Sequence, residues 1–283
     1  MITKIEKKKS KHLALQQIEN KQLSIQFSLD GFSFCVTDLD LLQHIIFLKY
    51  KFNNKILNPI TVLSSIKKIF IEEPILQEKY NKVVVIHVNN FSTFVPKALF
   101  DKDNLANYIK FNNKIFESDF FTYDTIANQD MFAVYVPYVN INNFFIDQFG
   151  TFDYKHSSSI LVEKTANEYV KNNATYFFIN VAKNHFDIVV HRNKKLQLYN
   201  TFSYTTKEDF IYYILFVMEQ LKLDVERIPL ILLGEIKEGD TLYEELYKYI
   251  RNVSFLEENT MYDSIIEIDE TIKRENFILF KSI

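Results

Sequence analysis

A pattern of predicted strands and helices that occurs twice constrains the fold more than any other feature of this sequence. In the later copy, residues 176–182, 186–191 and 196–202 are short runs rich in aromatic and β-branched residues, separated by polar turns. Such runs predict a three-stranded antiparallel meander. Apolar residues then recur at helical spacing between 210 and 221, and a continuous apolar run at 229–233 predicts a strand covered on both faces.

A second amphipathic helix completes the later copy. Apolar residues from Leu242 to Ile250 recur at helical spacing, with Asp240 as a candidate N-cap. Thr205 and Glu208 have the spacing of a capping box and predict the start of the first helix. The predicted order is therefore three strands, a helix, a strand and a helix.

The earlier copy begins with a predicted hairpin. Asp30-Gly31 lies between two β-prone runs and is a signal for a two-residue type I′ turn, and residues 43–52 supply a third strand. Asn58-Pro59 predicts the start of a helix, because proline is favoured at the first helical position. The remaining predicted elements are a buried strand at 83–88, a strand at 91–95 and a helix at 103–110.

The duplication predicts an α/β chain of two lobes, although two mixed α/β halves can also look alike by chance. We expect residues 1–22 to form a flexible basic tail, 23–173 to form the first lobe and 174–283 to form the second. Within the first lobe, an extra segment at 115–173 has no predicted counterpart in the second. Its many aromatic residues either form a protein interaction surface or fill an ordinary core.

Composition excludes several classes of protein. The net charge of −3 provides no general attraction to nucleic acid or to an anionic membrane, so we expect neither as a partner. Cys35 is the only cysteine, which rules out an intrachain disulfide and a cysteine-based zinc site, and we expect it in the core. No apolar run reaches about 18 residues, and the basic first residues lack the apolar stretch of a secretory signal. We therefore expect a cytoplasmic protein without a membrane span.

Glycine is scarce in this chain. The sequence has four glycines, whereas average usage of about 7% would give roughly 20 in this length. Loops that cradle phosphates use glycine because it lets backbone N–H groups approach the anion closely. Neither G-x-x-x-x-G-K-[ST] nor G-x-G-x-x-G occurs. Any nucleotide site in this chain would therefore be unusual.

The segments LQLYNTFSYTTKEDFIYYILFVMEQLKL at 196–223 and PLILLGEIKEGDTLYEELYKYIRNVSF at 229–255 resemble an uncharacterised bacterial family, domain of unknown function 3822. The resemblance covers most of the chain. It implies the actin-like ATPase superfold, which has two ribonuclease-H-like lobes, mixed sheets flanked by helices, and nucleotide bound between the lobes.

The superfold binds nucleotide through three motifs, of which only fragments occur here. Its first phosphate motif, D-x-G, corresponds to Asp30-Gly31, which lacks the spacer and can equally be a plain hairpin turn. Its second corresponds to the turn around Lys183, which has neither an acid nor a glycine and can simply be solvated. Its adenosine motif corresponds to Gly234-Glu235, where the carboxylate would crowd and repel a nucleotide, although Gly234 can also just end a strand. The resemblance makes these five residues the candidates for a vestigial nucleotide cleft.

Other chemistries have less support in the sequence. The best acids for Mg²⁺ are Asp30, Asp38 and Asp187, but nothing in the sequence pairs them. The first strands of the two lobes lack the clustered carboxylates of a two-metal nuclease. His156 precedes the serines at 157–159, which suggests a base and a nucleophile, yet an N-cap for the next helix explains those serines better.

We therefore predict a non-catalytic or weakly nucleotide-binding actin-like protein that acts through an unknown protein partner. No catalytic residue, metal ligand or bound cofactor is predicted. The alternative is an ATP-dependent enzyme, an ATPase or a kinase-like protein, with degenerate phosphate loops and with ATP and Mg²⁺ as cofactors.

Overall fold

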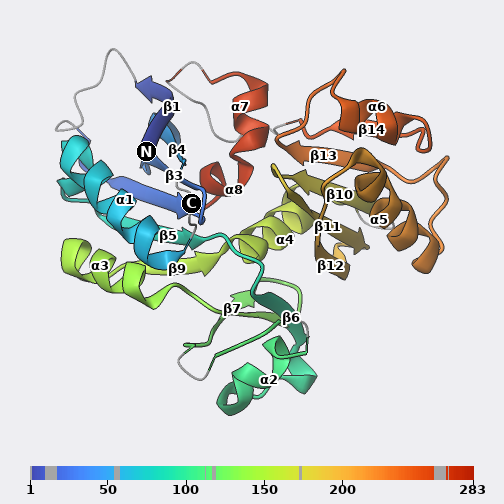
Figure 1. The fold of residues 1–283 in the computed structure, drawn as a ribbon, viewed down its shortest axis with the longest axis horizontal. Coiled ribbons are helices and arrows are strands. Elements are labelled where there is room, and N and C mark those ends of the chain that lie inside the picture. Colours follow the sequence, from blue (N-terminus) through green and yellow to red (C-terminus); the bar gives the residue numbers. More distant parts are fainter. Residues whose placement is uncertain are drawn as a thin grey trace. The chain divides into compact units, whose positions relative to one another are not determined.

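The computed structural model divides the chain into two compact units, whose elements are labelled in Figure 1. Unit 1 comprises Met1–Ile160, Thr260–Ile268 and Ile278–Ile283, and unit 2 comprises Leu161–Asn259 and Asp269–Phe277, each taken over its described residues. The structure describes residues 2–9, 18–53, 58–111, 113–116, 119–171, 174–257, 266 and 268–283. The division between the units falls within helix α4 (Ser157–Glu168).

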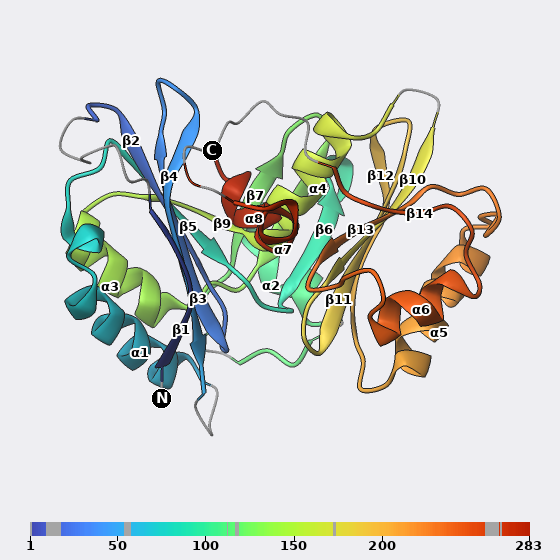
Figure 2. The ribbon, with the colours of Figure 1, turned by 90° about the horizontal axis from the view of Figure 1, so that it is seen from above.

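Unit 1 is built on a six-stranded mixed sheet with the order β1-β4-β3-β2-β5-β9. The strands are β1 (Ile2–Lys9), β2 (Lys21–Phe27), β3 (Gly31–Asp38), β4 (Gln43–Phe52), β5 (Lys82–His87) and β9 (Asp153–His156). The first four in this order are antiparallel, whereas β5 runs parallel to β2 and β9 runs parallel to β5. Helices α1 (Pro59–Glu72) and α3 (Val139–Phe149) cover one face (Figure 2). Phe27, Phe70 and Phe145 are part of the core between them and the sheet.

Unit 2 is built on a five-stranded mixed sheet with the order β12-β11-β10-β13-β14. The strands are β10 (Thr175–Val181), β11 (His185–Arg192), β12 (Lys195–Ser203), β13 (Leu230–Gly234) and β14 (Val253–Phe255). The first three in this order are antiparallel, whereas β13 runs parallel to β10 and β14 runs parallel to β13. Helices α5 (Lys207–Gln220) and α6 (Thr241–Tyr247) cover one face, and Phe186, Phe210 and Leu232 are part of the core beneath them (Figure 2).

The two units repeat one topology, which confirms the predicted duplication. In both, three antiparallel strands are followed by a helix, a parallel strand, a second helix and a further parallel strand. The ladder between the second and third strands also carries a bulge at the same place. It falls between Val36 and Thr37 in β3, and between Val190 and His191 in β11. Val36 pairs with Ile46 of β4, and Val190 pairs with Leu198 of β12. The shared bulge therefore makes Ile46 and Leu198 equivalent positions, and β4 and β12 equivalent strands.

A three-stranded antiparallel sheet is inserted between β5 and α3 of unit 1. Its strands are β6 (Ser92–Pro96), β8 (Met131–Tyr135) and β7 (Thr122–Ile126), with the short helix α2 (Leu105–Ile109) beside them. The segment without a counterpart in unit 2 therefore lies between β5 and α3, and it overlaps only the first part of the predicted range 115–173, which includes β7 and β8. The later part of the prediction was wrong, because α3 and β9 are the counterparts of α6 and β14.

Both ends of the chain also differ from the prediction. Ile2–Lys9 forms strand β1 on the edge of the unit 1 sheet, where we expected part of a flexible tail. Residues 278–283 belong to unit 1, although we placed all of 174–283 in the second lobe. Phe280 of the short helix α8 (Phe277–Phe280) packs edge-on against Phe47, and Ser282 Oγ donates to Ser24 Oγ at 2.8 Å. The remaining short elements are α7 (Glu270–Glu275) and three 3₁₀ helices, Pro74–Gln77, Lys97–Leu99 and Lys102–Asn104.

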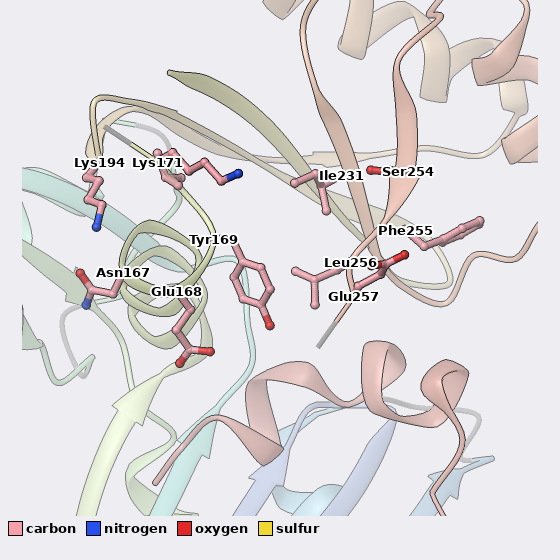
Figure 3. Close-up of a pocket in the computed structure, with 11 residues that line it drawn as sticks. Asn167, Glu168, Tyr169, Lys171, Lys194, Ile231, Ser254, Phe255, Leu256 and Glu257 are labelled. Carbon is pink, nitrogen blue, oxygen red and sulfur yellow. The ribbon is translucent and has the colours of Figure 1, made fainter. Parts of the chain in front are cut away.

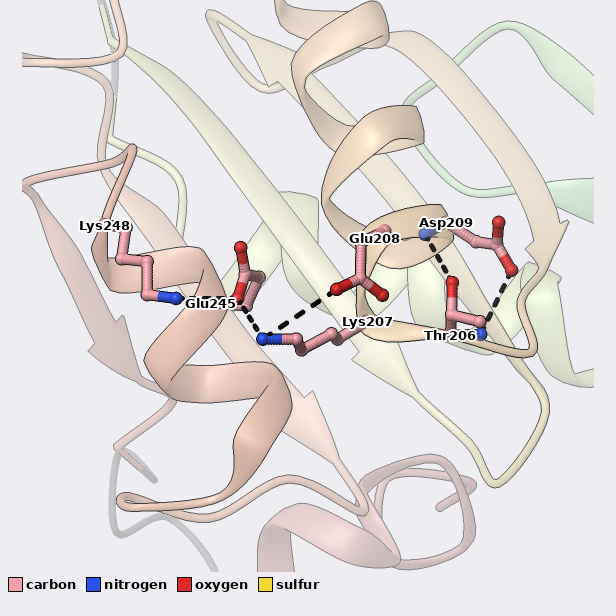
Figure 4. Close-up of polar contacts among 6 residues, drawn as sticks. All are labelled: Thr206, Lys207, Glu208, Asp209, Glu245 and Lys248. Atoms are coloured by element: carbon pink, nitrogen blue, oxygen red, sulfur yellow. Dashed lines mark hydrogen bonds and ion pairs between the residues drawn. The ribbon is translucent and has the colours of Figure 1, made fainter.

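The two long helices that follow the third strands begin at capping boxes. Asn58 caps α1 with Pro59 at the first helical position, as predicted. Helix α5 begins one residue later than predicted, because Thr206 rather than Thr205 is its N-cap and Asp209 closes the box (Figure 4). The pKa of the Asp209 carboxyl is lowered, chiefly by the hydrogen bond that it accepts from the Thr205 backbone N–H.

Candidate functional site

The end of β13 and the β10–β11 turn form a tight corner in unit 2. Val181 of β10 pairs with Gly234 of β13, which has a φ of +80°. A Cβ on Gly234 would lie 2.1 Å from the Val181 carbonyl oxygen and 2.6 Å from its nitrogen. The Glu235 N–H donates to that same oxygen at 2.7 Å. Gly234 is therefore required by the packing of the protein's own backbone, and the space beside it is filled.

The turn between β10 and β11 is closed in the same way. Its Ala182 N–H donates to the His185 carbonyl at 2.9 Å, and the Tyr204 hydroxyl donates to the Ala182 carbonyl at 2.7 Å. The Tyr204 N–H donates to the Asn184 carbonyl at 3.1 Å. Burial, with a further effect of the Glu235 charge, raises the pKa of the Tyr204 hydroxyl. The structure thus brings the turn that contains Lys183 beside Gly234 and Glu235.

Asp187 lies near this corner, and neighbouring strands supply its hydrogen-bond donors. Tyr199 Oη and Thr201 Oγ1 of β12 donate to its Oδ1 at 3.0 and 2.7 Å, and Asn180 Nδ2 of β10 donates to its Oδ2 at 3.1 Å. All four side chains are half-buried or nearly so. The cluster holds one carboxylate in place but offers no second acid for a divalent cation.

Asp30 and Gly31 belong to the β2–β3 turn of unit 1. The type I′ turn that we predicted is wrong, because neither residue has a positive φ and Gly31 is already the first residue of β3. The Ser28 N–H donates to the Gly31 carbonyl at 3.0 Å, so Leu29 and Asp30 are the central residues of the turn. Ser28 Oγ donates to Asp30 Oδ1 at 2.6 Å. Asp38 stabilises another turn, because its carboxylate accepts from the N–H groups of residues 40 and 41.

A buried acid, Asp124, attaches the inserted sheet of unit 1 to the start of α4. It accepts hydrogen bonds from Ser159 Oγ at 2.6 Å, from the His156 N–H at 2.9 Å and from Tyr135 Oη at 3.0 Å. Burial raises the pKa of this carboxyl, and the three donors oppose that effect. These contacts supply hydrogen-bond partners to both carboxyl oxygens inside the protein, which makes Asp124 an anchor between two elements.

His156 and Ser158 lie as close together as a catalytic base and nucleophile, but both are buried where no substrate can reach them. His156 Nδ1 lies 2.7 Å from Ser158 Oγ and accepts from the Ser158 N–H at 3.2 Å, and its Nε2 donates to the Asn89 carbonyl at 3.1 Å. The histidine is fully buried and the serine is 1% exposed. Burial lowers the pKa of His156 to about 3. The three serines form the first turn of α4, so the pair is structural.

Cys35 lies in the core, as predicted, and burial raises the pKa of its thiol to about 12. Within the described ranges, no group of three or more His, Cys, Asp or Glu side chains is placed to hold a metal ion. None of the helices described combines the length and hydropathy that crossing a membrane requires.

A pocket of about 720 Å³ lies on unit 2, between the C-terminal end of α4 and strands β13 and β14 (Figure 3). Tyr169 and Leu256 face each other in its apolar part. Its polar side chains carry both signs of charge. The lining residues are Asn167, Glu168, Tyr169, Val170, Lys171, Lys194, Ile231, Ser254, Phe255, Leu256 and Glu257. This composition suits a small amphipathic ligand, and it does not assemble the groups of any one reaction.

The family model described as "Protein of unknown function (DUF3822)" matches residues 10–253. This chain belongs to the DUF3822 family. The resemblance inferred from residues 196–255 is thereby confirmed. No curated protein matches the DUF3822 chain.

Solved structures place the DUF3822 chain in the actin-like ATPase fold. A Bacteroides thetaiotaomicron protein, described as having an actin-like ATPase fold and unknown function, is 23% identical, with a TM-score of 0.78 over 86% of this chain and 93% of that one. A PilM–PilN type IV pilus biogenesis complex is 10% identical, with a TM-score of 0.55 over 92% and 97%. The ethanolamine utilization protein EutJ from Carboxydothermus hydrogenoformans is 9% identical, with a TM-score of 0.50 over 96% and 91%. The predicted actin-like α/β fold, with mixed sheets flanked by helices, is confirmed.

Sequence reasoning missed three features of the DUF3822 chain. The pocket combines two stretches, 167–171 and 254–257, with the single residues Lys194 and Ile231, and no spacing in the sequence links them. Asp124 receives its donors from the strand β8 and from the start of α4. Only the strand register could have indicated the Asp187 cluster, because Asn180 and Thr201 lie directly opposite Asp187 across the ladders.

Proposed function

We propose that this DUF3822 protein acts through protein–protein contacts and does not turn over ATP. The observation that carries the proposal is the corner at the end of β13. There the Val181 backbone fills the space beside Gly234, and the Glu235 N–H is bonded to the Val181 carbonyl. The Gly234-Glu235 backbone, which the resemblance makes the counterpart of the adenosine motif, is thus engaged with the protein's own chain.

The charged groups near these motifs also oppose a nucleotide. Glu235 adds negative charge where an adenine nucleotide would have to approach, and Lys183 is the only cation of the adjoining turn. A nucleotide-bound Mg²⁺ is held by one or two carboxylates that remain available to it. Asp187 is held by three neighbouring side chains, and Asp30 accepts from Ser28. These acids therefore serve local structure.

Exposed aromatic side chains support contact with a protein partner. Tyr212 and Tyr247 are 62% and 48% exposed, on the two helices that cover the unit 2 sheet. Aromatic residues are enriched at protein interfaces. One structure of similar fold is the PilM–PilN type IV pilus biogenesis complex, which is an example of an actin-like fold in an assembly. A cytoplasmic location, expected from the sequence, is part of the same proposal, and cell fractionation tests it.

Calorimetric titration of the full chain with ATP and Mg²⁺ tests the absence of turnover. We expect no saturable binding up to millimolar nucleotide and no phosphate release. Submillimolar binding that is lost in Lys183→Ala and kept in the control Arg192→Ala, at the far end of β11, would overturn the proposal in favour of an ATP-dependent enzyme. Gly234→Trp is unsuitable for this test, because a side chain there would collide with Val181 and unfold the corner.

Reciprocal affinity purification tests the protein partner. We expect a single protein to be recovered with the tagged chain, and the tagged partner to recover this chain in return. Retention of the complex in Lys183→Ala and its loss in Tyr212→Glu or Tyr247→Glu would support contact through the aromatic surfaces. A complex that forms only with added ATP would contradict the proposed mode of action.

A further inference from the structure

Three aromatic side chains of unit 2 form a row of stacked rings that joins strand β14 to helix α6. Phe255 of β14 stacks on Tyr243 of α6, with ring centroids 5.5 Å apart and an interplanar angle of 14°. Tyr243 stacks in turn on Tyr247, one helical turn further along, at 5.8 Å and 22°. The row therefore has two ends, Phe255 and Tyr247.

The Phe255 end of the row already holds a cation. The guanidinium of Arg274, on helix α7, lies over the Phe255 ring at 4.6 Å from its centroid. A guanidinium is attracted to the face of an aromatic ring by the ring quadrupole, and its flat shape suits stacking. The protein's own packing thus shows that this row accepts an arginine.

The Tyr247 end of the row is exposed. Tyr247 is 48% exposed, and its contact with Tyr243 is the ring contact that the described residues give it. Within the described part of the chain, no lysine or arginine lies over the Tyr247 ring as Arg274 lies over Phe255. One end of the row is therefore covered by a guanidinium, whereas the other is accessible.

Two carboxylates lie beside the exposed end. Glu244 precedes Tyr247 by three residues on α6, a spacing that puts both side chains on one face of the helix. Burial raises the pKa of the Tyr243 hydroxyl, and the charges of Glu238 and Glu244 raise it further, so both acids lie near the row. Among the described residues, neither Glu238 nor Glu244 has an ion-pair partner.

The neighbouring cations are already paired. Lys237 lies 3.7 Å from Glu275, and Lys248 lies 2.9 Å from Glu245 (Figure 4). Residues 205–252 contain ten acids and six lysines or arginines, so the acidic surplus of the chain falls in this segment. The charge around the exposed ring therefore favours a cationic side chain.

We propose that Tyr247 receives an arginine side chain of the protein partner, with the guanidinium over the ring and bonded to the Glu244 carboxylate. Glu238 adds negative charge to the same site. Arginine fits better than lysine, because its planar fork stacks on a ring and bonds a carboxylate at the same time. The inference rests on the proposed function, since it specifies the partner's chemistry at a surface that the proposed contact includes.

An NMR titration of the full chain, labelled with ¹³C in its tyrosine rings, tests the site. The probe is a capped peptide with arginines separated by Gly-Ser pairs, compared with the same peptide containing lysine or citrulline, the uncharged isostere of arginine. We expect the Tyr247 signals, identified by their loss in Tyr247→Leu, to shift with the arginine peptide and not with the citrulline peptide. The lysine peptide should bind about threefold more weakly. No shift of Tyr247 at millimolar arginine peptide, or equal binding of the citrulline peptide, would overturn the proposal.

Substitutions separate the ring from the charge. Tyr247→Leu keeps an apolar side chain and should weaken binding of the arginine peptide about fivefold, and Glu244→Gln should weaken it about threefold. The matched control is Tyr249→Leu, because Tyr249 is 46% exposed and stands outside the row. It should bind the peptide like the wild type. Unchanged binding in Tyr247→Leu would contradict the site.

Reciprocal purification with the same variants distinguishes this inference from the proposed function. Loss of the complex in Tyr247→Leu and its retention in Tyr249→Leu would support an arginine of the partner at Tyr247. A complex that tolerates both Tyr247→Leu and Glu244→Gln would overturn this inference and leave the proposed protein contact standing. Recovery of no partner would count against the proposed function, and the peptide titration would then decide by itself whether Tyr247 binds arginine.

Discussion

Units 1 and 2 share their strand order and the position of a β-bulge, but they differ in their edge strands, their insertions and the burial of their polar groups. Unit 1 covers its third strand with β1 and inserts a small sheet after β5, whereas in the described part of unit 2 no strand pairs with the outer side of β12 and no sheet is inserted between β13 and α6. Unit 1 buries the polar groups of Asp124 and His156, whereas the Asp187 cluster of unit 2 is only half-buried. The duplicated topology therefore fixes the layers, while additions to the ends and connections decide which surfaces stay available to partners.

The largest difference between the units in the stability lost on substitution is expected at Gly234 of unit 2 and Gly31 of unit 1. Gly234→Ala should reduce the free energy of unfolding by about 4 kcal/mol or more, because a Cβ there meets the Val181 backbone and φ is unfavourable for alanine. Gly31→Ala should cost about 1 kcal/mol, because the nearest atom, the Tyr50 carbonyl oxygen, is 3.2 Å away and φ is ordinary. Urea denaturation followed by circular dichroism measures both.

Gly239→Ala is the control for backbone strain alone. Its φ is +83°, and no atom lies within 4 Å of the added Cβ, so the expected loss is about 1–2 kcal/mol. A Gly234→Ala variant no less stable than Gly239→Ala would show that the corner yields to a side chain. The space beside Gly234 would then be open to a ligand, and the argument against a nucleotide would lose its main support.

The next largest difference in lost stability is expected between Asp124 of unit 1 and Asp187 of unit 2, which each accept three hydrogen bonds. Asp124→Ala should destabilise unit 1 by about 3 kcal/mol, because it leaves Ser159, Tyr135 and the His156 N–H without their acceptor in a buried place. Asp187→Ala should cost about 1 kcal/mol in unit 2, because water can replace a half-buried carboxylate. Hydrogen exchange of sheet amides in each unit separates the two effects.

An equal loss in both variants would contradict this ranking by burial. The conservative changes sharpen the test. Asp124→Asn keeps the shape of the side chain but replaces one acceptor oxygen with a donor, so it should still be destabilising. Thr201→Val removes one donor to Asp187 and should have a smaller effect than Asp187→Ala.

The sequence was sufficient for the local elements and for their order. Gln43–Phe52 is a strand, and Asn58 and Pro59 start a helix, because alternation and capping are determined by nearby residues. The resemblance to DUF3822 added the superfold. The failures concern pairing over long distances. Nothing in the lysine-rich sequence of β1 indicates that β4 is its partner, and nothing near Ser282 indicates contact with Ser24.

The candidate nucleotide residues show the same limit. Placing Lys183, Gly234 and Glu235 at one corner follows from the strand order, which the duplication supplied. Whether Gly234 serves a ligand or a neighbouring strand depends on a distance of 2.1 Å to Val181, and composition alone cannot give such a distance. The glycine count pointed away from a phosphate loop, but it could not show what fills the space instead.

The smallest change in stability is expected at the connection between the second and third strands of each unit. In unit 1 Leu42 adopts a φ of +53°, and in unit 2 Asn193 and Lys194 adopt +54° and +63°, so each connection holds a residue in the left-handed region. A leucine there costs about 1–2 kcal/mol, which exceeds the roughly 0.5–1 kcal/mol of chain entropy that glycine loses on folding. The Leu42 side chain is 40% exposed, so the packing lost on its removal offsets part of this gain, and Leu42→Gly should stabilise the protein by less than about 0.5 kcal/mol.

Lys194→Gly should give a similar gain in unit 2 and makes the comparison direct. Leu42→Asn is the matched control, because asparagine tolerates the left-handed region without the added flexibility of glycine. Thermal unfolding of the four proteins, wild type included, measures these shifts. A loss of stability in Leu42→Gly together with a gain in Lys194→Gly would mean that the two connections differ in conformation, and that the duplication does not extend to this turn.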